Sequence, residues 1–148
     1  MIIVDASVAV KWFVREPGAK AARALLGGSE RLIAPALIRM EVAAAMTRKA
    51  RTGELSPEDS QASCDIWLRA IGNGVLALSR DEDDLAAAIK LAIEIKHPLR
   101  DCLYLALARR RVVGSLRGYE EPHSKPAPVC HPNMSVNIFN EASYRALA

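Results

Sequence analysis

Aromatic residues are scarce in this sequence: Phe, Trp and Tyr together make up 5% of the 148 residues. Proteins that hold single-stranded nucleic acid by stacking its bases depend on exposed aromatic side chains, so we do not expect that binding mode. The hydrophobic residues, 51% of the chain, are mainly Ala, Leu, Ile and Val. This composition favours a helix-rich α/β protein over a β-sandwich.

Cysteines are also few, and Cys64, Cys102 and Cys130 are widely spaced. Such an odd, scattered set is unlike a disulfide framework, so we expect a reducing compartment. No apolar run approaches the 18 residues that cross a membrane. The N-terminal apolar segment is interrupted by Asp5 and Lys11 and lacks the basic start of a signal peptide. We therefore expect a cytoplasmic protein with no membrane partner.

The excess of positive charge is small, with a formal net charge of +3 and a pI near 8.9. It is compatible with a polyanionic partner but does not by itself indicate one. A chain of this length fits one domain, and we predict a single domain over residues 1–148. After residue 111 the helical pattern gives way to Pro-rich segments, so residues 112–148 form a divergent C-terminal segment.

Short apolar runs alternate with helical patterns along the chain. We predict short buried strands at residues 1–4, 31–34 and 75–78, with a further candidate at 135–139. The predicted helices cover residues 6–14, 19–26, 36–52, 56–71, 81–95 and 99–111. This alternation predicts a three-layer α/β/α domain in which helices cover both faces of a central, mainly parallel sheet.

Most of the acidic residues have an ordinary explanation. The acids of residues 81–84 crowd the start of a predicted helix, where negative charge is favourable. We interpret them as a solvated first turn.

Two other acids lie where an element begins or ends. Asp5 directly follows the apolar run of residues 2–4, and the carboxyl ends of parallel strands open onto the ligand crevice. Asp101 lies in the first turn of the helix that follows Pro98. The alternatives are structural: Asp5 as a helix N-cap, and Asp101 as an acid stabilised by the helix dipole.

Glu41 lies in the middle of a predicted helix. Its helical neighbours three and four residues away are all apolar: Leu37, Ile38, Ala44 and Ala45. Burying a carboxylate among such residues is costly unless a partner compensates its charge. The alternatives are an ion pair with Arg39 or Lys11 and a role as a metal ligand.

The three carboxylates have a common explanation if they converge. Converging acids repel one another, and burial raises their pKa values. A divalent cation removes both problems, and an oxygen-only ligand set suits Mg²⁺ or Mn²⁺ better than Zn²⁺. We therefore predict a metal site built from Asp5, Glu41 and Asp101, which are also the predicted catalytic residues.

The segments around these acids resemble PIN-domain ribonucleases of the VapC toxin type. The matching segments are IIVDASVAVKWF, LIAPALIRMEVAAAM and HPLRDCLYLALA, which occur in family order within residues 1–111. The resemblance implies a PIN-like fold, Mg²⁺- or Mn²⁺-dependent cleavage of RNA, a homodimer, and neutralisation by a cognate VapB-type antitoxin. It also places Ser7 as a small hydroxyl residue near the first acid, for which an ordinary helix-start Ser is the alternative.

The C-terminal part departs from the family pattern, which usually supplies a fourth acid in a Thr-x-Asp segment. No Asp follows Asp101 in this chain, and Glu120 or Glu121 is the available substitute. One hypothesis is a frameshift after residue 111, which translation of the other two reading frames tests. The departure keeps a second interpretation open: a catalytically impaired PIN-fold module that dimerises or binds antitoxin without cleaving RNA.

Six basic residues are candidates for contacting RNA phosphates: Lys11, Arg15, Arg39, Arg48, Lys49 and Arg51. We interpret Trp12 and Trp67 as core or dimer contacts rather than base-stacking platforms, and Cys102 as a core thiol. A small phosphatase or receiver-like domain is a third functional alternative, but the acid pair that a receiver carries before its first helix is not evident.

Overall fold

The sheet is small and entirely parallel. A computed structural model describes residues 1–117 and 129–130. Its strands are β1 (Ile2–Val4), β2 (Leu32–Pro35), β3 (Ala77–Ser79) and β4 (Val129–Cys130), in the order β3-β2-β1-β4. All three strand pairs are parallel. The three strands predicted first are confirmed, the fourth lies at 129–130, and the candidate at 135–139 lies outside the described residues.

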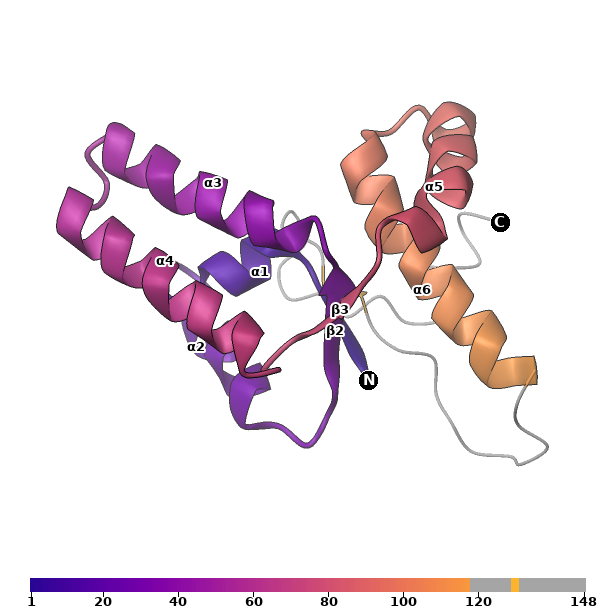
Figure 1. Cartoon of the computed structure of the whole chain (residues 1–148), viewed down its shortest axis with the longest axis horizontal. Coiled ribbons are helices and arrows are strands. Elements are labelled where there is room, and N and C mark those ends of the chain that lie inside the picture. The colour runs from indigo at the N-terminus through magenta and orange to yellow at the C-terminus, as the bar shows by residue number, and fades with distance from the viewer. Residues whose placement is uncertain (118–128, 131–148) are drawn as a thin grey trace.

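Helices cover both faces of this sheet. They are α1 (Ala6–Val10), α2 (Ala19–Ala24), α3 (Ile38–Arg51), α4 (Pro57–Gly72), α5 (Glu82–Ile95) and α6 (Leu99–Arg117), with a short 3₁₀ turn η1 (Leu25–Gly27). Helices α1 to α4 lie on one side of the strands, and α5 and α6 lie on the other (Figure 1). The predicted three-layer α/β/α architecture is therefore confirmed. No helix in the described part of the chain is long and apolar enough to cross a membrane.

The first helix is shorter than the pattern predicts because tertiary bonds take over its last turn. After Val10 the N–H groups of residues 11–13 bond to carbonyls three residues earlier, and that of Val14 makes a long bond, 3.3 Å, to the carbonyl of Val10. The indole Nε1 of Trp12 donates to the carbonyl of Ala22 at 3.0 Å. Arg23 donates in return to the carbonyls of Trp12 and Val14. These bonds fix the residues after α1 against α2.

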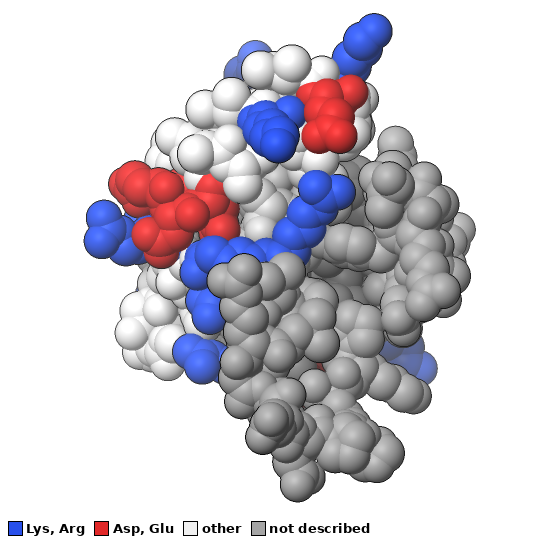
Figure 2. Space-filling model, turned by 90° about the vertical axis from the view of Figure 1, so that its right-hand side faces the viewer, with Lys and Arg blue, Asp and Glu red and all other residues white. Residues whose placement is uncertain are grey.

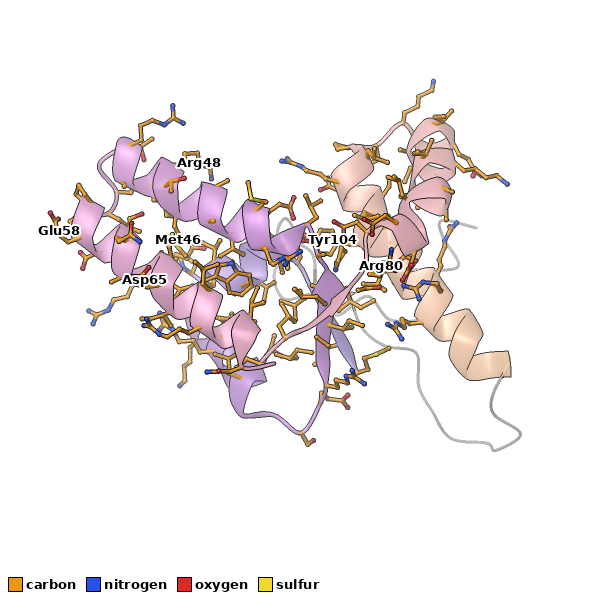
Figure 3. All side chains as sticks on the ribbon, viewed as in Figure 1. Met46, Arg48, Glu58, Asp65, Arg80 and Tyr104 are labelled. Atoms are coloured by element: carbon orange, nitrogen blue, oxygen red, sulfur yellow. The ribbon has the colours of Figure 1, made fainter. Side chains whose placement is uncertain are left out.

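The main core lies between the sheet and helices α1, α3 and α4. Trp67 is completely buried and Trp12 nearly so, with their ring centroids 6.2 Å apart. Met46 packs in the same cluster, between α3 and α4 (Figure 3). A second cluster between α5 and α6 includes the fully buried Cys102. Of the two roles left open for the tryptophans, the structure shows core packing, and the prediction of a core thiol at Cys102 is confirmed.

One acid predicted to be solvated is buried instead. Asp84 is only 3% exposed and shares the buried face of α5 with Ala88 and Leu91. Both of its oxygens accept from Arg110, at 2.6 and 2.8 Å, and Arg110 also donates to the hydroxyl of Ser79 at 2.7 Å. The prediction of a solvated first turn is thus wrong for Asp84, whose charge is compensated by a bidentate ion pair joining α5, α6 and β3.

Candidate functional site

The three predicted acids line one pocket. This cavity of about 530 Å³ lies among α1, α3 and the start of α6. Its lining comprises Asp5, Ala6, Ser7, Val10, Glu16, Met40, Glu41, Ala44, Ala45, Arg48, Lys49, Arg100 and Asp101. The acids come from separate elements, because Asp5 follows β1, Glu41 lies on α3 and Asp101 lies on α6.

Asp5 is positioned by the junction between β1 and α1. It is the N-cap of α1, and its Oδ1 accepts a 2.7 Å hydrogen bond from the backbone N–H of Ser7. The capping role proposed as its structural alternative is therefore formed. The cap orients the carboxylate at the carboxyl end of β1, an inner strand of the sheet, where it also borders the pocket.

Next to Asp5, a buried hydroxyl has no partner. The Oγ of Ser7 is inaccessible to solvent and makes no hydrogen bond within the described residues. Buried polar groups are normally satisfied, and this one belongs to a pocket-lining residue. Ser7 therefore carries an unsatisfied polar atom beside the first carboxylate.

Glu41 is partly buried and is held by α6 rather than by a cation. Tyr104 Oη donates a 2.6 Å hydrogen bond to its Oε2. Neither cation proposed as an ion-pair partner fulfils that role, since Arg39 donates to the carbonyl of Ala36 and Lys11 to that of Pro17. The predicted burial is partial, because the neighbouring Ala44 is exposed.

The electrostatic environment disfavours the ionised form of Glu41. Burial is the main cause that raises the pKa of its carboxyl, and the negative charges of Asp5 and Asp101 raise the pKa further. The hydrogen bond from Tyr104 and the charge of Arg100 act in the opposite direction. Asp5 and Asp101 are therefore both close enough for their charges to act on Glu41.

Asp101 lies in the first turn of α6, as predicted. Its carboxylate lies 3.2 Å from Nε2 of His97 and 3.7 Å from Nε of Arg100. Arg100 is largely exposed and lines the pocket. A cation thus accompanies the acids at this end of the pocket, where a bound phosphate needs charge compensation.

The donor chemistry of the pocket fits a hard divalent cation, although the acids are not gathered tightly. Among residues 1–117 and 129–130, no three His, Cys, Asp or Glu side chains form a group that could hold a metal ion. Nevertheless, carboxylate and hydroxyl oxygens are suitable ligands, Ser7 Oγ lacks a partner, and a cation would relieve the repulsion felt at Glu41. The pocket contains suitable ligands, which binding would have to draw together.

Sequence reasoning missed Tyr104 and Arg100. A signal for Tyr104 was present, because a phenol between Leu103 and Leu105 indicates a buried hydroxyl that needs a partner. Arg100 gives no signal beyond its place beside Asp101. The substitutes for a fourth acid, Glu120 and Glu121, lie outside the described residues.

Comparison with known families agrees with this fold. The PIN domain family matches residues 2–113, so the chain belongs to the PIN domain family. PIN domains are typically nucleases that depend on divalent metal ions. Membership therefore supports a nuclease, a hydrolase of phosphodiester bonds, as the general class of this protein. A comparison with curated proteins finds no match to the sequence.

Proposed function

We propose that the protein is a cytoplasmic endoribonuclease of the VapC toxin type that hydrolyses RNA with Mg²⁺ or Mn²⁺. The observation that carries the proposal is the convergence of three carboxylates, from three elements of a PIN domain, on one pocket. Carboxylates assembled around a divalent ion are a recurrent means of hydrolysing phosphodiesters.

In this proposal Asp5, Glu41 and Asp101 hold the metal. When bound, a divalent ion supplies a Lewis acid for the phosphate and lowers the pKa of an attacking water. Tyr104 fixes Glu41 by its hydrogen bond. Arg100, which lines the pocket beside Asp101, stabilises the negative charge that grows on the phosphate oxygens.

The proposed partners are a second copy of the chain and a VapB-type antitoxin. Helix α5 supports a partner surface, because Leu85, Ile89 and Ile93 recur every four residues and are 40, 44 and 74% exposed. Uncharged surface separates the charged groups on the face that carries α5 and α6 (Figure 2). Contiguous exposed apolar surface commonly marks a protein contact.

A second candidate is a PIN-fold module that binds its partners without cleaving RNA. Two observations favour it: the acids form no tight metal-binding group within the described residues, and no Asp follows Asp101 in the sequence. A site with fewer acids binds metal less tightly, so the two candidates differ in catalysis rather than in fold.

Cleavage of RNA distinguishes the two candidates. We would incubate the protein with structured and unstructured RNA in Mg²⁺, Mn²⁺ or EDTA, alongside Asp5→Asn, Glu41→Gln and Asp101→Asn. Glu58→Gln is the matched control because Glu58 is an exposed acid in the first turn of α4, away from the pocket. We expect metal-dependent cleavage by the wild type and the control only. Cleavage equal in all variants, or absent from all, would contradict the enzymatic proposal.

A further inference from the structure

The six basic residues predicted as candidates for contacting RNA phosphates differ in whether they line the pocket. Only Arg48 and Lys49 line the pocket. Lys49 is already engaged, with its Nζ 2.7 Å from Glu54 and 3.7 Å from Glu16, and its side chain is 16% exposed. Arg48 is exposed and makes no hydrogen bond or ion pair within the described part of the chain. Its charge acts on Glu54 through space, but of the three pocket cations it is the one that forms no ion pair within the described residues.

Arg48 and Glu41 lie at two ends of one face of α3. Residues spaced by three, four and seven positions share a helix face, which here joins Glu41 to Ala44, Ala45 and Arg48. At about 1.5 Å per residue, Arg48 lies roughly 10 Å along the helix from Glu41. Figure 3 shows Arg48 on the side of α3 that faces away from α4.

The charged residues of the pocket are therefore distributed unevenly along α3. Asp5, Glu41, Asp101 and Arg100 lie at one end, and Arg48 lies at the other, where Glu16 pairs with Lys49; Ala44 and Ala45 lie between the two ends. Small side chains leave room for a chain to lie along α3. A guanidinium suits a phosphate because its planar donors can form two parallel hydrogen bonds to phosphate oxygens.

We propose that Arg48 forms a subsite for a phosphate of the RNA strand other than the one that is cleaved. This inference rests on the proposed function, because it places the cleaved phosphate at the carboxylate end. A separation of roughly 10 Å corresponds to about three nucleotides at 3.4 Å each in a stacked strand, and to fewer in an extended strand. Arg48 therefore contacts a phosphate one to three nucleotides from the cleaved bond.

The first test measures binding without cleavage. A labelled seven-nucleotide single-stranded RNA is titrated with the full chain in EDTA at low salt, and fluorescence anisotropy gives the Kd. We expect Arg48→Gln to weaken binding about fivefold and to reduce the salt dependence by roughly one phosphate contact. Arg51→Gln is the matched control, since Arg51 is an exposed cation one turn further along α3 that does not line the pocket.

The second test locates the phosphate. Seven-nucleotide RNAs each carry one neutral methylphosphonate in place of a phosphate, at successive positions. At one or two positions, the methylphosphonate is expected to weaken wild-type binding as much as Arg48→Gln does. At the same positions it should not weaken the binding of the Arg48→Gln protein any further. Equal effects of Arg48→Gln and Arg51→Gln, additivity at every position, or no binding by the wild type would overturn the subsite.

These outcomes are separable from failure of the proposed function. The binding measurements contain no metal and no cleavage, whereas the proposed function fails when no metal-dependent cleavage occurs. Cleavage that persists while Arg48→Gln behaves like Arg51→Gln removes the subsite alone. If no cleavage occurs but Arg48→Gln still weakens binding more than Arg51→Gln does, the proposed reaction fails and the phosphate contact of Arg48 stands.

Discussion

Tyr104 and Glu41 are joined by a 2.6 Å hydrogen bond that links α6 to α3 beside the pocket. The phenol is almost completely buried. Burial is the main cause that raises its pKa above the ordinary value of 10, and the hydrogen bond to Glu41 and the charge of Glu41 add to the effect. Tyr104 therefore stays protonated and donates at any physiological pH. Figure 3 places Tyr104 where the two helices approach each other.

The first prediction concerns this bond. Tyr104→Phe should lower the free energy of unfolding by about 1–2 kcal/mol, because a partly buried carboxylate loses its donor. It should also weaken Mn²⁺ binding, since Glu41 is no longer held in place. Urea denaturation and Mn²⁺ titration check the two effects. The control is Tyr104→Phe combined with Glu41→Gln: if the hydrogen bond matters, the two substitutions are not additive.

The second prediction concerns the pH dependence of stability. The pKa of Glu41 in the folded protein is raised above its ordinary value of 4.5. As pH rises, Glu41 therefore loses its proton in the unfolded chain before it does so in the folded protein. The free energy of unfolding falls over this pH range, and the stability that Glu41 contributes at low pH is lost once pH has passed the pKa of the folded protein. Glu41→Gln removes this loss. We expect it to be more stable than the wild type at pH 7 by about 1 kcal/mol or less.

Denaturation at pH 4 and pH 7 checks this prediction. The advantage of Glu41→Gln should shrink at pH 4, where the wild-type carboxyl is largely protonated. Glu58→Gln serves as the exposed control and should show little change at either pH. A Glu41→Gln protein that is less stable than the wild type at pH 7 contradicts the environment described for this carboxyl.

The third prediction concerns the ion pair between Asp84 and Arg110. Arg110→Leu leaves a buried carboxylate without its partner, which costs about 2–4 kcal/mol. Asp84→Asn should cost less, because the amide keeps the shape of the carboxylate and carries no charge. Glu82→Gln, at an exposed acid in the same turn of α5, should change stability by under about 0.5 kcal/mol. A similar loss in all three variants, measured by denaturation, argues against a special role for the pair.

The fourth prediction concerns metal linkage. If the pocket binds Mn²⁺, the ion stabilises the folded state by about 2.7 kcal/mol at a concentration 100 times its Kd. The midpoint of thermal unfolding should therefore rise with Mn²⁺ in the wild type and rise much less in Asp5→Asn or Asp101→Asn. Asp59→Asn, at an exposed acid of α4, should behave like the wild type. If the midpoint of thermal unfolding does not change with Mn²⁺ in the wild type or in any variant, the result contradicts a metal site.

Much of the fold follows from local patterns. The apolar run of residues 2–4 indicates a strand, and a serine followed by a proline, as at Ser56 and Pro57, is a typical helix start. The structure contains β1 and α4 at these places. The short strand at 129–130 gave no comparable signal, because a two-residue strand is too short to show a pattern of apolar residues. Its place is set by pairing with β1, which is a contact between distant parts of the chain.

The placement of the acids around one pocket was also predictable, but their immediate partners were not. Asp5 and Asp101 lie at element boundaries that the sequence marks. The donor to Glu41 comes from Tyr104, 63 residues further along the chain, and no local pattern reveals it. Asp84 differs from its acidic neighbours only by sharing a face with Ala88 and Leu91, a helical spacing that the charge pattern obscured.

The strand order has a consequence for how the protein is made. The strand that ends at Asp5 is paired on one side with β2 and on the other with β4, whose residues are 129 and 130. During synthesis the chain emerges from its N-terminal end, so β1 meets its last neighbour only after nearly all of the described chain has left the ribosome. A nascent chain therefore exposes an open strand edge next to its first carboxylate, and the sheet is completed only when translation has passed residue 130.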